Sequence, residues 1–375
     1  MKRILIANDM LKGGGVENVL ENLVRYLLNH DYDVSLYIPD CKQEDAEEVF
    51  GKDIKVFPHV RTLKYIRQFS LSWFWDRGKY VVENKMIHWK LFRENFDVVI
   101  ALKEGATMKE MSHIRAGSKY AWIHTDYRYM HWSKGYFWSK KCERKCMAKY
   151  DRIICVSDAA KDSVIEVIGD SGNLCVKYNP MDCQKILILS KNAITESNDR
   201  NEIRFISVGR LEYPKNQKLL LEVCEALNKK YKFELWIIGD GQDRKMLLEM
   251  IEKKHLDNVK MFGTLNNPYP YIKDSDVFVS TSICESYGLS VQEALTLGIP
   301  VITTECPAMR EVFDTRFGML VDNSFQSVYE AMEKMITDSK LRDIYRENIE
   351  KFFDRESLYE DRLKSICALW EGKDE

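Results

Sequence analysis

The stretch "DVFVSTSICESYGLSVQEALTLGIPVITT", residues 276–304, places two apolar runs on either side of a turn and a segment with helical spacing. Glu285 and Glu293 lie eight positions apart within it. In one uninterrupted helix, eight steps end about 80° beyond two full turns, so the two carboxylates would not share a face. The interval suits a loop that becomes a helix. We therefore predict a turn at Gly288, with Glu285 on the loop and Glu293 one turn into a helix over residues 289–297.

Apolar runs alternate with helical segments along most of the chain. Helical segments such as "GVENVLENLVRYLLNH" lie between most of the apolar runs. The further runs are "RILIAND", "DVSLYIP", "DVVIALK", "KYAWIH", "RIICVS", "IRFISVG", "FELWIIG" and "NVKMFG". Apolar strands that alternate with amphipathic helices predict an α/β class with doubly wound parallel sheets covered on both faces.

The series breaks once, between "YNPMD" and "NEIRFISVG", where the second half of the connection is polar. A chain of 375 residues also exceeds the usual size of a single core. We predict two Rossmann-like domains facing a cleft, residues 1–180 and 181–355, and a terminal helix in residues 356–375 that crosses back to the first domain. In such sheets, ligand sites lie beyond the carboxyl ends of the strands.

Composition excludes several classes of protein. The net charge of -2 argues against a dedicated nucleic-acid binder. The ten cysteines lie mostly in apolar runs without C-x2-C spacing, a pattern typical of reduced thiols in the cytosol. The first apolar run breaks at Asn8, and no later run reaches the roughly 18 residues that a membrane span needs. We expect a cytoplasmic protein without a signal sequence or membrane span.

Two loops after predicted strands have groups suited to phosphate. In "MLKGGGVEN", the amides of Gly14 and Gly15 can approach an anion at a helix start, although a glycine turn without a ligand is the alternative. In "RLEYPKNQ", Arg210 and Lys215 can stabilise the charge that grows on a diphosphate leaving group, although two surface bases are the alternative. A dinucleotide site is disfavoured, because the glycine loop is not G-x-G-x-x-G and no acidic residue ends the second strand before Pro39.

Four segments in this order closely resemble the carboxyl-terminal domain of the retaining GT-B glycosyltransferases of family GT4. They are "SVGRLEYPKNQ", "IIGDG", "VKMFGTL" and "STSICESYGLSVQEALTLGIPVITTECPAMREV". "GGGVENVLENLV" resembles the amino-terminal loop and helix of the same family. The resemblance covers nearly the whole chain, is most specific in residues 203–312 and is absent between residues 57 and 95.

The resemblance implies a role for each candidate residue. Glu293 would hold the ribose hydroxyls of the donor nucleotide, and Glu285 would contact the donor sugar. Arg210 and Lys215 would grip the diphosphate. The remaining donor contacts would come from the amides around Tyr287, Gly288 and Leu289, the glycine loop at Gly14 and Gly15, the turn at Gly239, and the base position at Thr264 and Leu265.

His124 ends "KYAWIH" at the position of the family's cleft histidine, so the resemblance implies a catalytic place near the reacting sugar, with a structural histidine as the alternative. Asp126 follows on the same loop and is better interpreted as a turn residue than as an acceptor contact. "DSD", residues 274–276, imitates a metal motif of another glycosyltransferase fold. It lies at the wrong end of its strand for the cleft, and the family needs no bound metal, so neither metal nor cofactor is expected.

The function implied by the resemblance is retaining, metal-independent hexosyl transfer from a nucleotide diphosphate sugar, expected to be UDP-linked, to a hydroxyl of a growing surface glycan or lipid-linked acceptor. The departing phosphate would accept the proton of the hydroxyl that attacks on the same face. "KYNPMD" resembles enzymes of capsule, lipopolysaccharide or teichoic acid assembly. The alternatives are a starch or sucrose synthase type with a soluble acceptor, and a catalytically silent nucleotide-sugar-binding subunit that supports a partner.

Two stretches of the predicted first domain are basic and aromatic. Residues 60–94 hold eight bases against three acids, a net charge of +5, and residues 115–152 hold ten against three, a net charge of +7. The interleaved aromatic residues are Trp73, Phe74, Trp75, Trp89, Trp132, Phe137 and Trp138. This mixture suits a lipid headgroup region, so we predict peripheral docking on an anionic membrane, with an ordinary aromatic core under a basic surface as the alternative.

Overall fold

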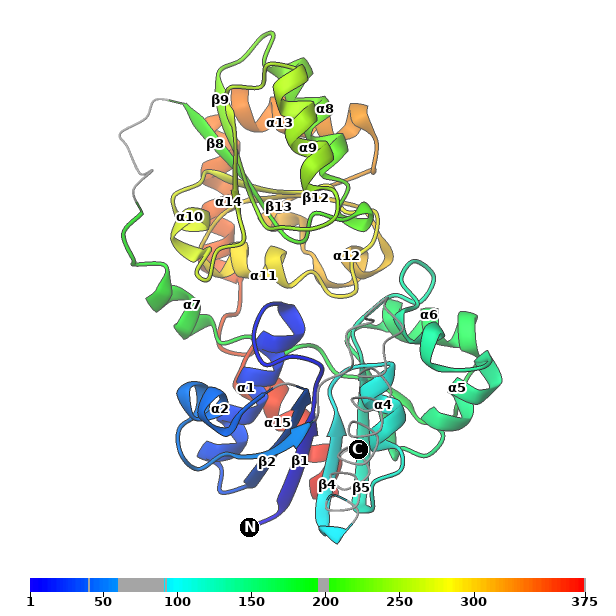
Figure 1. Ribbon diagram of the computed structural model, residues 1–375. Helices are drawn as coiled ribbons and strands as arrows, with labels where there is room; N and C mark the ends of the chain where they lie inside the picture. The colour runs from blue at the N-terminus through cyan, green and yellow to red at the C-terminus, as the bar shows by residue number, and fades with distance from the viewer. Residues whose placement is uncertain (40, 60–90, 92, 195–201, 374–375) are drawn as a thin grey trace, which may run out of the picture. The chain divides into compact units, whose positions relative to one another are not determined.

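The computed structural model describes residues 1–39, 41–59, 91, 93–194 and 202–373. It contains two parallel sheets, each packed against its own helices (Figure 1). Contacts divide the chain into one unit of residues 1–181 with 360–375, and a second unit of residues 182–359. The predicted α/β class with two Rossmann-like domains of the GT-B fold is confirmed. The predicted divisions lay after residues 180 and 355, and the divisions in the structure lie after residues 181 and 359.

The first unit contains seven strands among the described residues, in the order β3-β2-β1-β4-β5-β6-β7, and all of their pairings are parallel. Its strands are β1 (Arg3–Ala7), β2 (Asp33–Pro39), β3 (Lys55–His59), β4 (Phe96–Ala101), β5 (Ala116–Ile123), β6 (Arg152–Cys155) and β7 (Leu174–Val176). Its helices are α1 (Gly15–Asn29), α2 (Gln43–Phe50), α4 (Ala106–Met111), the 3-10 helix η1 (Trp132–Tyr136), α5 (Lys140–Met147), α6 (Asp158–Ile168) and α15 (Glu360–Glu371).

The second unit repeats this plan with six parallel strands within residues 202–359, in the order β10-β9-β8-β11-β12-β13. Its strands are β8 (Ile203–Val208), β9 (Phe233–Ile238), β10 (Val259–Gly263), β11 (Val277–Ser280), β12 (Val301–Thr304) and β13 (Gly318–Val321). Its helices are α7 (Cys183–Leu189), η2 (Tyr213–Lys215), α8 (Gln217–Leu227), α9 (Arg244–Lys253), α10 (Tyr269–Lys273), α11 (Leu289–Thr296), α12 (Pro307–Val312), η3 (Thr315–Phe317), α13 (Phe325–Thr337) and α14 (Ser339–Phe352).

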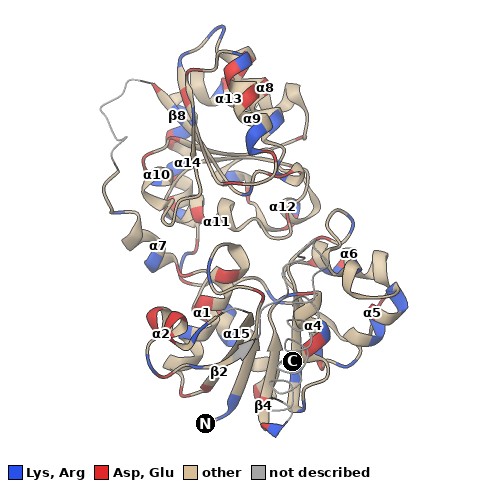
Figure 2. Ribbon diagram, viewed as in Figure 1, with Lys and Arg blue, Asp and Glu red and all other residues tan. Residues whose placement is uncertain are grey.

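The strands form the interior of each unit because most of their side chains are apolar. Four successive residues of β1, Ile4 to Ala7, have no exposed surface. Figure 2 shows the charged residues mainly on helices and loops, with the strands largely uncharged. Parallel strands buried on both faces require such continuous apolar runs. The order of each sheet reverses at one point, between β1 and β4 and between β8 and β11, and the carboxyl ends of these strand pairs are where ligands bind in this class.

The last helix, α15, belongs to the first unit. Tyr120 on β5 donates a hydrogen bond from its hydroxyl to the Leu369 carbonyl at 2.8 Å, and its ring lies 5.5 Å from that of Trp370. No helix in the described part of the chain is long and apolar enough to cross a membrane.

The "DSD" segment is an ion-paired structural element before β11. The guanidinium of Arg204, which is 2% exposed, pairs with Asp274, and the Arg204 amide donates to Asp276 Oδ2 at 2.8 Å. Arg346 Nη2 lies 3.2 Å from Asp276 Oδ1. Both carboxylates therefore neutralise arginines at the amino end of β11, away from the carboxyl ends of the strands.

Candidate active site

The loops after β8 and β11 are joined at the switch point of the second sheet. The Ile283 amide donates to the Pro214 carbonyl at 2.8 Å, and Thr281 Oγ1 donates to the Asn216 carbonyl at 2.9 Å. Asn216 adopts a left-handed φ of 50°, which asparagine tolerates better than most residues. These bonds place the lysine of the first loop opposite the first glutamate of the second.

Lys215 and Glu285 form the most direct contact between predicted site residues. Lys215 Nζ lies 2.6 Å from Glu285 Oε1, and the same oxygen accepts a hydrogen bond from Ser282 Oγ at 2.7 Å. Glu285 is 8% exposed, whereas the lysine side chain is 23% exposed. Because an ammonium group has three N–H donors, Lys215 can hold Glu285 and still offer donors to an anion.

Arg210 forms its ion pair with a different residue, Glu212. Its side chain is 57% exposed, and its Nη1 lies 2.9 Å from Glu212 Oε1 on the same loop. The structure thus brings Lys215 to Glu285 but leaves Arg210 on the surface beside Glu212. The expected role of Arg210 at the diphosphate stays a prediction.

Gly288 forms the predicted turn, and α11 begins at the next residue. Its φ of 76° lies in the left-handed region, and a Cβ there would meet Met309 Cε at 2.4 Å. The helix runs from Leu289 to Thr296, so the predicted turn and helix are confirmed within one residue. Tyr287, just before the turn, is buried, and Leu289 is partly exposed. A side chain at position 288 would disturb both the loop of Glu285 and the start of α11.

We expect Gly288→Ala to lower the free energy of unfolding by about 2 to 4 kcal/mol, since left-handed backbone costs about 1 to 2 kcal/mol and overpacking adds a similar amount. Gly298→Ala is the matched control: its φ is 77°, but a Cβ there would meet nothing within 4 Å. Urea denaturation of both variants measures the difference. Equal losses would mean that Met309 moves aside at no cost.

Glu293 lies in the first two turns of α11 and is partly buried. Tyr269, at the start of α10, donates a hydrogen bond to Glu293 Oε1 at 3.3 Å. Burial raises the pKa of Glu293 to about 7, and the hydrogen bond from Tyr269 only partly offsets this shift. Thr264 and Leu265 follow β10 on the loop that leads to Tyr269, the threonine exposed and the leucine half-buried. A partly protonated carboxyl at this position would be ionised fully by ligand hydroxyls that donate to it.

Gly239 has a structural reason to be glycine. Its φ is 139°, and a Cβ there would lie 1.9 Å from the Gly209 carbonyl oxygen at the end of β8. The Gly209 amide donates to the Ile238 carbonyl, and the Gly239 amide donates to the Gly263 carbonyl. The ends of β8, β9 and β10 therefore pack backbone against backbone. A donor contact at Gly239 remains a prediction.

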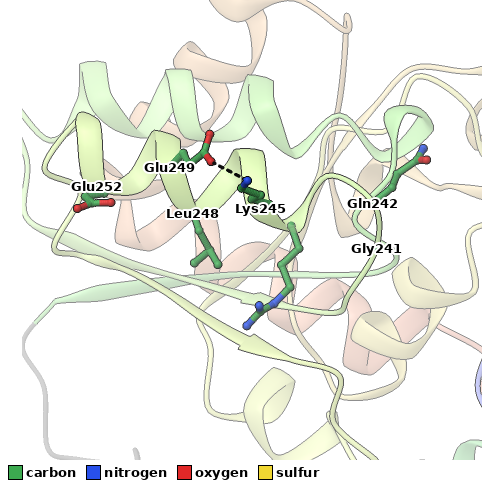
Figure 3. Close-up of a pocket in the computed structure, with 7 residues that line it drawn as sticks. Gly241, Gln242, Lys245, Leu248, Glu249 and Glu252 are labelled. Carbon is green, nitrogen blue, oxygen red and sulfur yellow. Dashed lines mark ion pairs between the residues drawn. The ribbon is translucent and has the colours of Figure 1, made fainter.

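A pocket of about 490 Å³ lies along the start of α9 (Figure 3). Its lining consists of Gly241, Gln242, Arg244, Lys245, Leu248, Glu249 and Glu252. Lys245 and Glu249 form an ion pair across one helical turn at 3.8 Å. The pocket contains none of Arg210, Lys215, Glu285 or Glu293, so we do not assign the donor site to it.

In the first unit, the glycine loop begins α1 without a side-chain cap. Gly14 is the N-cap and Gly15 the first helical residue. Glu17 is 6% exposed, and its Oε2 is the atom that a Cβ at Gly14 would meet, at 2.8 Å. Asn8 Nδ2 donates a hydrogen bond to the other oxygen of Glu17 at 3.3 Å. The role of Gly14 and Gly15 in holding an anion stays a prediction.

His124 follows β5 and is held in a neutral state. Burial lowers its pKa to about 3, although a hydrogen bond to the Leu102 backbone acts in the opposite direction. Its Nε2 is buried and has no hydrogen-bond partner among the described residues. At neutral pH the ring is therefore uncharged, and no described residue forms a hydrogen bond with its Nε2.

Glu104, which the sequence analysis missed, positions the His124 loop. It is 3% exposed, its Oε2 accepts from the His124 amide at 3.2 Å, and its Oε1 accepts from Thr125 Oγ1 at 2.6 Å. Burial raises the pKa of this carboxyl. Its position just after the predicted strand "DVVIALK" could have identified it, because side chains at the carboxyl ends of neighbouring strands lie close together. Ser282 and Tyr269 were missed as well, and only their contacts with the two glutamates identify them.

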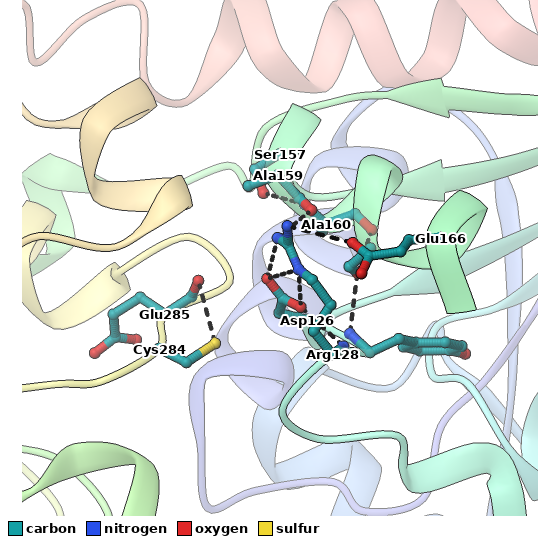
Figure 4. Close-up of polar contacts among 10 residues, drawn as sticks. Asp126, Arg128, Ser157, Ala159, Ala160, Glu166, Cys284 and Glu285 are labelled. Atoms are coloured by element: carbon teal, nitrogen blue, oxygen red, sulfur yellow. Dashed lines mark hydrogen bonds and ion pairs between the residues drawn. The ribbon is translucent and has the colours of Figure 1, made fainter. Parts of the chain in front are cut away.

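Asp126 is a turn residue, the interpretation that the sequence favoured. Its side chain is 1% exposed, and both of its oxygens accept hydrogen bonds from Arg128 (Figure 4). Arg128 also donates to the Ala159 carbonyl at 3.1 Å and lies 3.9 Å from Glu166. The carboxylate is therefore used to tie the loop to α6.

Comparisons with known proteins agree with this architecture. The family described as Glycosyltransferase Family 4 matches residues 13–185, and the family described as Glycosyl transferases group 1 matches residues 190–352. An uncharacterized glycosyltransferase of Methanocaldococcus jannaschii is 21% identical over 96% of this chain and 95% of its own length. The Campylobacter jejuni N-acetylgalactosamine-N,N'-diacetylbacillosaminyl-diphospho-undecaprenol 4-alpha-N-acetylgalactosaminyltransferase is 29% identical over 59% of this chain and 61% of its own.

Solved structures share the fold at low sequence identity. Anabaena HepE in complex with UDP and glucose superposes with a TM-score of 0.72 at 17% identity, covering 98% of this chain and all of that chain. TarM of S. aureus superposes with a TM-score of 0.74 at 16% identity, covering 99% of both chains. The two family matches together cover most of both units. The chain therefore belongs to the GT4-type glycosyltransferases of the GT-B fold.

Proposed function

We propose that this glycosyltransferase moves a sugar, with retention of anomeric configuration, from a UDP-linked donor to a hydroxyl of a growing lipid-linked glycan. The observation that supports this most is the Lys215–Glu285 contact of 2.6 Å at the switch point of the second sheet, with Glu293 on the helix that follows. This arrangement offers a cation for the diphosphate, a carboxylate for the sugar and a second carboxylate for the ribose.

The identity of donor and acceptor is inferred from relatives. Anabaena HepE has been crystallised with UDP-glucose, and the name of the Campylobacter jejuni relative includes a diphospho-undecaprenol-linked sugar. The Erwinia amylovora relative, 23% identical over 91% of this chain, is named for amylovoran biosynthesis. A UDP-sugar and a lipid-linked surface glycan are the substrates most consistent with these neighbours.

Retention is proposed from the resemblance to retaining enzymes, and the contacts of Glu285 favour same-face attack over a covalent intermediate on this residue. Its Oε1 is held by both Lys215 and Ser282, so the carboxylate is engaged rather than free to attack the sugar. In the proposed step, the acceptor oxygen bonds to the anomeric carbon on the face from which the diphosphate departs. The bond between that carbon and the phosphate oxygen breaks, and the phosphate oxygen takes the proton of the acceptor hydroxyl. Lys215 stabilises the negative charge that develops on the leaving group.

A donor screen tests the proposal. Purified protein, stripped of metal with EDTA, is incubated with UDP- and GDP-sugars, with and without a lipid-linked acceptor extract, and nucleotide release is followed. We expect release of UDP that depends on acceptor, gives a product with the donor's anomeric configuration, and is unchanged by EDTA. An absolute need for added Mn²⁺ or Mg²⁺ would contradict charge stabilisation by Lys215. Donor binding without any turnover would favour the silent-subunit alternative.

A further inference from the structure

The segment from η1 through α5 presents exposed aromatic side chains together with exposed cations. We call this the basic aromatic surface, and it consists of Trp132, Lys134, Tyr136, Trp138, Lys140, Lys141, Arg144, Lys145 and Lys149. Trp138 is 97% exposed, and Trp132 and Tyr136 are each 51% exposed. An indole that is almost fully exposed contributes almost no hydrophobic stabilisation to the fold, because that stabilisation comes from burial of the side chain.

The charged residues on the exposed face of α5 are all cations. Its three lysines and Arg144 are exposed, whereas its single acid, Glu143, is 1% exposed. Glu143 is turned inward, where its Oε2 lies 2.9 Å from His131 Nε2 and its other oxygen accepts from Ser133 Oγ. Figure 2 shows the resulting basic residues on α5. Burial of the only acid leaves the cations without a neutralising partner on their own helix.

The segment before α5 is held to the rest of the first unit by ring stacking and hydrogen bonds. The Tyr127 ring stacks on His131 at 4.5 Å, and the Tyr127 hydroxyl lies 3.1 Å from Ser133 Oγ, which donates its own hydrogen to Glu143. Lys109 Nζ donates to the Tyr136 carbonyl at 2.7 Å. These contacts hold the backbone of the segment that carries Trp132 and Trp138. This arrangement is preorganised for contact with something outside the unit.

Part of the predicted basic region does not belong to this surface. Lys119 is half-buried and donates to the Ser112 carbonyl at 3.2 Å, and burial lowers its pKa. Phe137 is half-buried beneath Lys109, whose Nζ lies 5.6 Å from the ring. Trp73, Phe74, Trp75, Trp89 and most of the bases of residues 60–94 lie outside the described residues.

We propose that the basic aromatic surface docks this enzyme on a membrane that contains anionic lipid, with the indoles at the boundary of headgroups and acyl chains and the cations at the lipid phosphates. Cations and exposed indoles have different preferred environments, and a headgroup region supplies both within a few ångströms. A soluble polyanion would satisfy the cations but leave Trp138 in water. The docking deepens the proposed function, because it would bring the enzyme to a lipid-linked acceptor.

The test is flotation of the full chain with vesicles of phosphatidylcholine alone or with phosphatidylglycerol. We expect binding only to the anionic vesicles, weakened by salt. Lys140→Glu/Lys141→Glu and Trp138→Ala should each weaken binding about tenfold or more. The matched control is Lys229→Glu/Lys232→Glu, which makes the same charge change at two exposed lysines of the second unit and should bind as the wild type does. Circular dichroism checks that all variants fold.

Lipids brominated in the acyl chain identify the contacting residue, because they quench tryptophan only at close range. Quenching should fall in Trp138→Ala. Absence of binding at low salt, binding unchanged by either surface variant, or displacement by polyphosphate with no contribution from Trp138 would overturn the proposal. Sugar transfer to a detergent-dispersed acceptor is measured in parallel. Transfer without vesicle binding refutes docking alone, and vesicle binding without transfer refutes the proposed function alone.

Discussion

Lys215→Ala is expected to lower turnover by about 10²- to 10³-fold, the effect of removing one fixed group that stabilises charge in a transition state. In the structure Lys215 Nζ lies 2.6 Å from Glu285 Oε1, so the cation is positioned at the switch point of the second sheet. If the diphosphate gains charge as the sugar leaves, this cation contributes more to the transition state than to the ground state. We therefore expect kcat to fall more than donor affinity, measured by nucleotide release and by calorimetry.

Two controls separate this role from a structural one. Lys218→Ala removes a nearby lysine on α8 whose side chain is 60% exposed and pairs with Glu222, and it should leave turnover unchanged. Lys215→Ala also leaves Glu285, 8% exposed, without its cation, which should lower the free energy of unfolding by about 1 to 3 kcal/mol. Adding Glu285→Gln should restore stability but not turnover. Recovery of turnover in that double variant would contradict a direct role for Lys215.

Glu293→Gln is expected to weaken donor binding about 10- to 100-fold at pH 8, because hydrogen bonds from two ribose hydroxyls to a charged group are replaced by weaker ones to an amide. Burial raises the pKa of Glu293 to about 7, so the wild-type carboxyl is partly protonated at neutral pH. Ribose hydroxyls favour its ionised form. Wild-type donor affinity should therefore rise as pH increases through 7, with protons released on binding, whereas the variant should show no such change.

The measurement is titration calorimetry with a UDP-sugar at several pH values and in buffers of different ionisation enthalpy. A UDP-sugar is preferred to UDP, because a terminal phosphate itself titrates near pH 6. Glu249→Gln, on an exposed position of α9, is the control for loss of a carboxylate. A variant whose pH dependence matches that of the wild type would place the nucleotide elsewhere.

Glu293→Gln should also stabilise the unliganded protein at high pH. The pKa of Glu293 is higher in the folded than in the unfolded chain, so the folded state holds the proton more tightly. The stability from this proton is complete below about pH 4 and is lost as pH rises through 7. At pH 8, Glu293→Gln should therefore increase the free energy of unfolding by roughly 3 kcal/mol. Urea denaturation at pH 6 and pH 8 should show a smaller gain at the lower pH.

The local alternation of apolar runs and helical segments was enough to predict two parallel-sheet domains, and "ESYGLSVQE" was enough to predict a turn at Gly288 and the start of α11. These features depend on neighbouring residues. A strand buried on both faces needs a continuous apolar run, and a left-handed turn before a helix needs glycine. The site residues were named largely through resemblance to a family, and their roles remain predictions.

What the tertiary structure decided are contacts between residues far apart in the sequence. Lys215 was expected to act with Arg210, five residues away, but its charged partner is Glu285, seventy residues away, because β8 and β11 are neighbours in the sheet. Glu104 supports the His124 loop because β4 and β5 are neighbours, and Glu143 turns inward because His131 and Ser133 face it. Sequence spacing determines which face of an element a residue occupies. Strand order determines which loops meet, and that depends on how the whole sheet buries its apolar surface.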